Sequence, residues 1–224
     1  MKYDLVMVAA SRDEDLKRMT QQAINSCLAD NVPVNVILVE THEKTAYHNV
    51  NKTIMYKGEF NYNHALNLGI AAGKADIVIM ANNDLLFQRG WSSIGQTMID
   101  NDYLSASALS NDFRQRPFKR GNYAYEGYLI GMQLTGWCIF AQRKLFERIG
   151  KLDERVRFWY SDNVYAEQLQ AEGIAHALIC NVNVLHLGSR TLSRTDHKTR
   201  NTLIYAEGKK FHQRHPENIQ KKLR

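Results

Sequence analysis

Apolar runs alternate along the first half of the chain with stretches in which apolar residues recur every three or four positions. The runs at 5–10, 34–39 and 75–81 predict strands that are covered on both faces. The stretches at 14–27 and 63–71 predict helices with one buried face. Strands that alternate with helices imply a mostly parallel sheet with right-handed crossovers. We therefore expect an α/β fold.

The second half of the chain is richer in strand-like segments. Strands are predicted at 103–109, 134–141, 175–180 and 182–187, with helices at 143–149 and 163–171. The stretch 111–128 combines basic and aromatic residues without a clear period and is predicted to be a mobile loop. These extra strands should add both parallel and antiparallel pairings to the sheet.

Polar residues stand at the carboxyl ends of several predicted strands. They are Ala10-Ser11-Arg12, Glu40, Asn82-Asn83-Asp84 and His186. In open α/β sheets, ligands bind beyond these strand ends. We therefore expect the four groups to converge on one site.

Asp84 is the strongest candidate for a metal ligand. A hard cation such as Mg²⁺ or Mn²⁺ prefers oxygen ligands and bridges well to a diphosphate. The competing interpretation is an ordinary turn, because Asn and Asp side chains often bond their own backbone. His186 adds a further ligand in the first interpretation and is merely structural in the second.

Asp162 follows three aromatic residues, Phe158-Trp159-Tyr160. Its carboxylate either caps the next helix or accepts a proton from an attacking hydroxyl. The aromatics either belong to the core or form a platform for sugar or base rings. Glu40 either contacts a uracil-like base or is an ordinary acid at a strand end.

The composition favours one folded domain. The chain has 224 residues, of which 44% are hydrophobic, and this excludes a disordered protein. We expect a single domain at 1–190 and a basic helical tail at 191–224 that packs on it or extends from it. No Walker phosphate loop and no GxGxxG turn is present, which disfavours ATPases and dinucleotide enzymes.

The net charge of +6 owes much to the C-terminal third. Such a tail binds nucleic-acid phosphates, lies on anionic lipid or faces water. The three cysteines, Cys27, Cys138 and Cys180, are widely spaced, so we expect reduced thiols. With no predicted membrane span or signal segment, we expect a soluble, cytoplasmic protein.

In their order along the chain, several motifs resemble those of glycosyltransferase family 2. The matching segments are 6–12, 37–40, 61–69, 77–84, 135–143 with Phe146, 149–154, 162–163 and 185–189. The resemblance implies a GT-A fold, which is a Rossmann-like, mostly parallel sheet with mixed strands in its second half. It also implies an inverting transferase that uses a nucleotide-diphosphate sugar with Mn or Mg.

Roles follow from this resemblance position by position. Asp84 looks like the aspartate of the metal-binding DXD-like motif, and His186 looks like the late metal-associated histidine. Asp162 is similar to the proposed base, and Glu40 to the acid that contacts the nucleobase, with UDP favoured. Expected donor contacts are Ala10, Ser11, Arg12, Asn63, Asn67, Asn82 and Asn83, and expected acceptor contacts are Trp137, Trp159 and Tyr160.

The short chain favours transfer of a single sugar. The acceptor classes left open are a surface glycan, a lipid-linked sugar and a hydroxymethylated DNA base. One alternative is a module that binds nucleic acid or an anionic glycan through a degenerate sugar site. Another is a sugar nucleotidyltransferase, although 11–14 lacks the glycines of its phosphate turn. The oligomeric state stays open.

Overall fold

The computed structural model describes residues 1–188 and 201. Apart from Asn201, the predicted basic tail at 191–224 lies outside the described residues. Its packing, and the division of the chain at residue 190, stay predictions.

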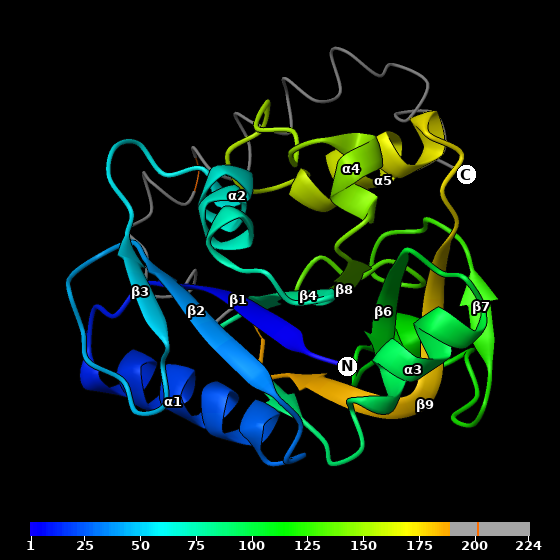
Figure 1. Cartoon of the computed structure of the whole chain (residues 1–224), viewed down its shortest axis with the longest axis horizontal. Coiled ribbons are helices and arrows are strands. Elements are labelled where there is room, and N and C mark those ends of the chain that lie inside the picture. The colour runs from blue at the N-terminus through cyan, green and yellow to red at the C-terminus, as the bar shows by residue number, and fades with distance from the viewer. Residues whose placement is uncertain (189–200, 202–224) are drawn as a thin grey trace.

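The strands of the described residues form one sheet (Figure 1). They are β1 (Tyr3–Ala9), β2 (Val34–Glu40), β3 (Lys52–Met55), β4 (Ile77–Asn82), β5 (Leu85–Phe87), β6 (Ser105–Leu109), β7 (Ala124–Glu126), β8 (Cys138–Gln142) and β9 (His176–His186). Their order is β3-β2-β1-β4-β8-β6-β9-β5, and β7 pairs with β9. The pairings from β3 to β4 are parallel, whereas β8 is antiparallel to both neighbours. The prediction of a parallel first half and a mixed second half is confirmed.

Helices cover both faces of this sheet. They are α1 (Glu14–Leu28), α2 (Tyr62–Ala72), α3 (Ser93–Asp100), α4 (Leu145–Ile149) and α5 (Ser161–Ala171), with a 3₁₀ turn at Phe113–Gln115. Helices α1 and α3 pack on one face, and α2, α4 and α5 pack on the other (Figure 1). Asn61 caps α2 by accepting a hydrogen bond from the His64 N–H group at 3.0 Å. The result is a three-layer α/β structure.

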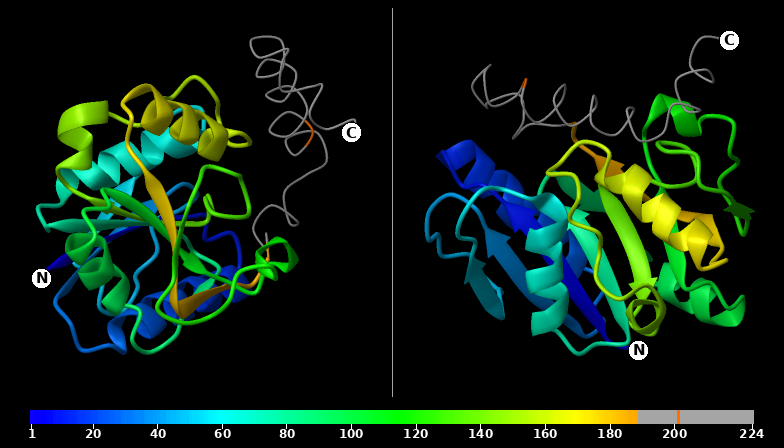
Figure 2. Two further views of the ribbon diagram at one scale, coloured as in Figure 1. Left: turned by 90° about the vertical axis from the view of Figure 1, so that its right-hand side faces the viewer. Right: turned by 90° about the horizontal axis from the view of Figure 1, so that it is seen from above.

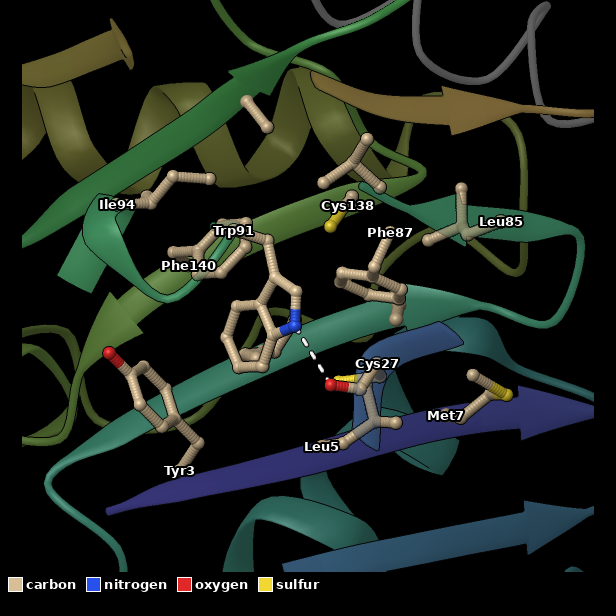
Figure 3. Packing of buried hydrophobic residues seen from close by; sticks show 14 of the residues in the cluster. Tyr3, Leu5, Met7, Cys27, Leu85, Phe87, Trp91, Ile94, Cys138 and Phe140 are labelled. Carbon is tan, nitrogen blue, oxygen red and sulfur yellow. Dashed lines mark hydrogen bonds between the residues drawn. The ribbon is translucent and has the colours of Figure 1, made fainter. Parts of the chain in front are cut away.

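Trp91 is the centre of the core on the α1 side. Its ring is fully buried and makes an edge contact with Tyr3 at 4.9 Å between ring centroids. Phe87 and Phe140 pack around the same ring (Figure 3). The indole N–H group donates to the Cys27 carbonyl at 2.8 Å, so its burial leaves no polar atom unpaired. This core ties β1, β5 and β8 to α1.

The predicted reduced state of the cysteines is confirmed, because Cys27, Cys138 and Cys180 are free and buried. Burial raises the pKa of all three thiols, in the case of Cys180 to about 11.

Among the described residues, no helix is both long and apolar enough to cross a bilayer.

Three features of the strands differ from the expectation. The three-residue strand β5 was not predicted, and the expected loop at 111–128 contains β7, which pairs with β9. Instead of two strands, β9 is one long strand that bends past the end of the sheet (Figure 2). Its register with β6 shifts between Ala108, which faces Ile179, and Leu109, which faces Asn183. Beyond this shift β9 runs antiparallel to β5, and this pairing places His186.

His176 makes the stability of the fold depend on pH. The ring is fully buried between Ser105 and Ser107, and burial lowers its pKa to about 3. Unfolded His takes up a proton below about pH 6.5, so the unfolded state binds more protons and stability falls as pH drops from there toward 3. From pH 7 to pH 5 we expect a loss of about 2 kcal/mol in the free energy of unfolding.

Urea denaturation of the wild type and of His176→Gln at both pH values measures this effect. The variant should lack most of the pH dependence, whereas the exposed-site control His48→Gln should retain it. An equal loss of stability in the wild type and His176→Gln would show that other groups cause it.

Candidate active site

Strand pairing brings Asp84 and His186 together. Asp84 precedes β5, and its carbonyl accepts the Leu187 N–H group at 2.9 Å, while Leu85 faces His186 in the β5–β9 register. The Asp84 Oδ2 and His186 Nε2 atoms are 3.2 Å apart. Asp84 is 3% exposed, so this contact is shielded from water. Residues about a hundred positions apart in the sequence therefore form one pair at the edge of the sheet.

Two atoms of this pair lack hydrogen-bond partners. Asp84 Oδ1 and His186 Nε2 are buried, and neither has a hydrogen-bond partner among the described residues, although Nε2 lies 3.2 Å from Asp84 Oδ2. Buried polar atoms are nearly always paired, so both need another partner. At ligand distances of about 2.1 Å, neighbouring ligands of an octahedral ion lie about 3 Å apart. The 3.2 Å spacing therefore fits two ligands of one Mg²⁺ or Mn²⁺ ion.

The protein supplies few ligands at this point. Within residues 1–188 and 201, no group of three His, Cys, Asp or Glu side chains is arranged to hold a metal. Mg²⁺ in proteins often keeps only one or two protein ligands and completes its shell with phosphate oxygens and water. The pair therefore suits a metal that arrives with a nucleotide.

The two asparagines before Asp84 have protein partners. Asn82 Oδ1 accepts the Tyr62 hydroxyl at 2.7 Å, and Asn83 Nδ2 donates to Thr20 Oγ1 at 2.9 Å. These bonds brace the turn between β4 and β5 against α2 and α1. The predicted donor contacts of Asn82 and Asn83 stay predictions.

Glu40 ends β2 and is fully buried. Its Oε1 atom accepts the N–H groups of Ser11 at 3.0 Å and His42 at 2.9 Å, and the Ser11 hydroxyl bonds to Oε2. Tyr47 OH in turn bonds to the Ser11 hydroxyl. Glu40 therefore ties the ends of β1 and β2 together, and a nucleobase reaches it only if surrounding side chains move. Its neighbours Ala10 and Arg12 lie in the turn after β1, where the Arg12 N–H group donates to the Ala10 carbonyl at 2.9 Å.

Asn63 and Asn67 hold the segment that leads to α5. Asn63 Nδ2 donates to the Asp153 carbonyl at 2.7 Å, and Asn67 bonds to both the N–H and C=O groups of Leu152. Asn67 also donates to Glu154 Oε1 at 2.9 Å. Both amides therefore have a structural task, and their contact with a donor stays a prediction.

Asp162 lies in the first turn of α5, which starts after Tyr160 in the left-handed conformation with φ of 70°. Its Oδ1 atom accepts the N–H group of the next residue, Asn163, at 3.0 Å. The capping interpretation is wrong, because α5 already begins at Ser161 and its N-cap residue, Tyr160, makes no side-chain capping bond. A Cβ atom on Gly136 would lie 2.8 Å from the Asp162 Cβ, so only glycine at 136 leaves room for the carboxylate. Burial raises the pKa of Asp162, against backbone hydrogen bonds and the charge of Arg114, which lower it.

Tyr62 links the two carboxylates. Burial raises the pKa of Tyr62, and the negative charges of Asp84 and Asp162 add to the effect. Tyr62 and Asp162 also line one narrow cavity of about 10 Å³, roughly the space of one water molecule. The proposed base and the proposed metal ligand therefore lie at the same edge of the sheet.

The aromatic residues predicted to contact an acceptor differ in their surroundings. Trp159 is 42% exposed and offers an open ring. The Trp137 ring instead stacks on the His186 imidazole, with 4.9 Å between centroids and planes 5° apart. The Arg114 guanidinium lies 5.8 Å from the centre of the same indole. Trp137 therefore contacts the candidate metal ligand directly.

The sequence did not single out Tyr62, Asn111 or Arg114. Asn111 and Arg114 lie in the predicted mobile loop, where basic and polar residues without a period gave no sign of a fixed position. Tyr62 was part of a matched motif but had no assigned role. The effect of the Asp84 and Asp162 charges on Tyr62 depends on long-range proximity that only the folded chain shows.

No protein-family profile matches this chain, and no curated protein sequence does. Solved structures do match. TarS from S. aureus, residues 1–349, superimposes with a TM-score of 0.62 at 8% identity over 91% of this chain and 69% of TarS. The same TarS fragment in complex with UDP-GlcNAc gives 0.62 at 10% identity, over 88% of this chain and 62% of that one.

GalNAc-T7 with UDP, GalNAc and Mn²⁺ gives a TM-score of 0.65 at 11% identity. The match covers 83% of this chain and 44% of GalNAc-T7, so this chain spans less than half of that protein. These neighbours are GT-A glycosyltransferases, and the predicted GT-A fold is confirmed.

Proposed function

We propose that this protein is a glycosyltransferase that moves one sugar from a nucleotide-diphosphate sugar to an acceptor hydroxyl, with inversion at the anomeric carbon. The Asp84 and His186 pair carries the proposal. Asp84 Oδ2 and His186 Nε2 lie at a spacing that suits one metal ion, and Asp84 Oδ1 and His186 Nε2 have no hydrogen-bond partner among the described residues. UDP-sugars are the favoured donors. The UDP-GlcNAc bound to TarS and the UDP, GalNAc and Mn²⁺ bound to GalNAc-T7 support this choice.

His186 Nε2 and the Asp84 carboxylate, whose Oδ2 atom lies 3.2 Å away, would hold Mn²⁺ or Mg²⁺. When bound, such an ion offsets the negative charge that develops on the departing diphosphate. A single carboxylate gives the empty site little affinity for a divalent ion. We therefore expect metal and nucleotide to bind together.

Asp162 is the proposed base. As the acceptor oxygen attacks the anomeric carbon, the hydroxyl proton passes to the Asp162 carboxylate. The bond between sugar and diphosphate breaks, and the nucleoside diphosphate leaves with the electron pair. Burial favours this role, because the raised pKa of Asp162 makes its carboxylate a stronger base.

The remaining contacts are assigned by position. The turn at Ala10, Ser11 and Arg12 follows β1 at the edge that also carries Asp84, and it is the proposed site of the donor nucleotide. The exposed Trp159 ring is the proposed platform for the acceptor. A surface glycan, a lipid-linked sugar or a hydroxymethylated DNA base can supply the acceptor hydroxyl.

The three buried thiols are in keeping with the proposed cytoplasmic location.

Replacing Asp84 tests the metal-assisted reaction. With Mn²⁺, calorimetry against a panel of nucleotide-diphosphate sugars should show binding of at least one donor to the wild type. In Asp84→Ala we expect Mn-dependent binding to weaken about 100-fold, because the variant loses the carboxylate that the protein offers to the ion.

Asp100→Asn is the matched control, since this acid is exposed on α3 and away from β5. It should bind the donor as the wild type does. Equal binding by the wild type and Asp84→Ala for every donor would exclude a metal at this position. Salt-sensitive binding of nucleic acid without any donor binding would instead favour the binding-module alternative.

A further inference from the structure

Asn111 holds the main chain of His186. Its Nδ2 group donates to the His186 carbonyl at 3.2 Å, and its Oδ1 atom accepts the His186 N–H group at 2.9 Å. One side chain therefore satisfies both backbone groups of the residue that ends β9. Asn111 is exposed and follows β6, so it is not needed to fill the core.

Arg114, from the same segment, lies against the ring that stacks on His186. Its guanidinium carbon is 5.8 Å from the centre of the Trp137 indole, and that indole is parallel to the imidazole within 5°. Asp112 fixes the guanidinium with a fork of two bonds, 3.0 Å to Nε and 2.8 Å to Nη2. The Asp112 carboxylate thus holds the Arg114 guanidinium, which lies against the Trp137 indole, which stacks on the His186 imidazole.

Gly131 makes room for this arrangement. The residue has φ of +79°, and a Cβ atom there would lie 2.2 Å from the Arg114 guanidinium carbon. Any other residue at 131 would displace the guanidinium from the indole. Asp112 and Gly131 therefore fix the Arg114 guanidinium beside the Trp137 ring, and that ring stacks on His186.

A histidine binds a metal more tightly when its ring is already held at the angle that points one nitrogen at the ion. Groups that orient such a ring commonly change metal affinity by about 10- to 100-fold when they are removed. Here the Asn111 amide fixes the backbone of His186, and the stack restricts rotation of the ring. We propose that Asn111, Arg114 and Trp137 are positioning residues that aim His186 Nε2 at the space beside Asp84. This inference rests on the proposed function.

The test measures Mn²⁺ affinity in the presence of UDP, by the free Mn²⁺ signal in electron paramagnetic resonance. Asn111→Ala and Trp137→Leu should weaken Mn²⁺ binding about 10-fold. Both variants should remain folded at the assay temperature, and their affinity for metal-free UDP should not change. Trp137→Phe keeps a flat ring and should recover most of the affinity.

Two variants examine the guanidinium. Arg114→Lys keeps the charge but loses the planar group that lies on the indole, so it should weaken Mn²⁺ binding as Arg114→Ala does. Arg116→Ala removes an exposed arginine two positions away and is the matched control. It should leave Mn²⁺ binding unchanged.

A metal-free measurement separates this inference from the proposed function. In NMR spectra of histidine-labelled protein, the ring signals of His186 are assigned by their loss in His186→Gln. They should be sharp in the wild type and broadened in Asn111→Ala and Trp137→Leu. Unchanged ring signals in these variants would overturn the positioning role even where Mn²⁺ binds. Ring signals that broaden as expected, in a wild type that binds no Mn²⁺ with UDP, would refute the metal-assisted function alone.

Discussion

Replacing Asp162 with Asn should slow the cleavage of a UDP-sugar into UDP and sugar by about 10²- to 10⁴-fold. This is the usual contribution of a positioned base. Asparagine has the shape of aspartate and keeps an oxygen for the Asn163 N–H group, now 3.0 Å away. It does not take up the acceptor proton. Steady-state UDP release with water as the acceptor measures the effect, and calorimetry should show unchanged UDP affinity.

The pH dependence of the wild type provides a second measure. Burial raises the pKa of Asp162, so its carboxyl loses the proton at a higher pH than an ordinary aspartate does. Because a base acts only when deprotonated, the rate should increase with pH through this raised pKa and then level off. Glu167→Gln, an acid on the same helix, is the matched control and should keep both rate and profile. Unimpaired turnover in Asp162→Asn would assign the carboxylate to the start of α5 alone.

The second large effect concerns stability. Asp4 is 1% exposed in β1, far along the strand from the candidate site, and pairs with Arg143 at 2.6 Å. Its carboxylate also accepts the Asn35 side-chain amide at 2.7 Å and the Ala75 N–H group at 2.8 Å. Asp4→Ala leaves three donors without their acceptor, and we expect a loss of about 3–5 kcal/mol in the free energy of unfolding.

Chemical denaturation of Asp4→Ala and Asp76→Ala measures this difference. Asp76 is exposed, and among the described residues its carboxylate accepts only a long bond of 3.4 Å from the Lys2 N–H group, so its removal should change stability by less than about 0.5 kcal/mol. Similar stabilities for the two variants would show that the buried carboxylate contributes nothing specific. Since Asp4 lies away from Asp84, the folded fraction of the variant should still bind donor.

Three strands of the parallel half of the sheet were predictable because each is a long apolar run. β1, β2 and β4 are covered on both faces, so their sequences lack polar alternation and are typical of buried parallel strands. β5 and β7 have three residues each, too few for a period to be seen. The continuous path of β9 was missed because the Asn181 region looks like a break in the apolar pattern, whereas it is a shift in register.

The polar residues of the site were predictable as a group, since they stand at strand ends on one edge. Their partners were not predictable, because each depends on a long-range contact. Glu40 illustrates the limit: its position was expected, but its full burial by Ser11 and the segment after β2 was not. Arg114 illustrates it as well, since its place depends on the missing side chain of Gly131, seventeen positions later in the chain.

The continuity of β9 limits the insertions and deletions that this strand can accept. Beyond the register shift with β6, from Val182 to the end of the strand opposite β5, side chains alternate between the two sides of the ribbon. Deleting or adding one amino acid there would reverse the side on which every later residue projects. The imidazole would then face away from the aspartate, even though no residue of the site had been exchanged. Homologues that keep this chemistry should therefore differ here by substitution, and confine insertions to the connections outside the strand.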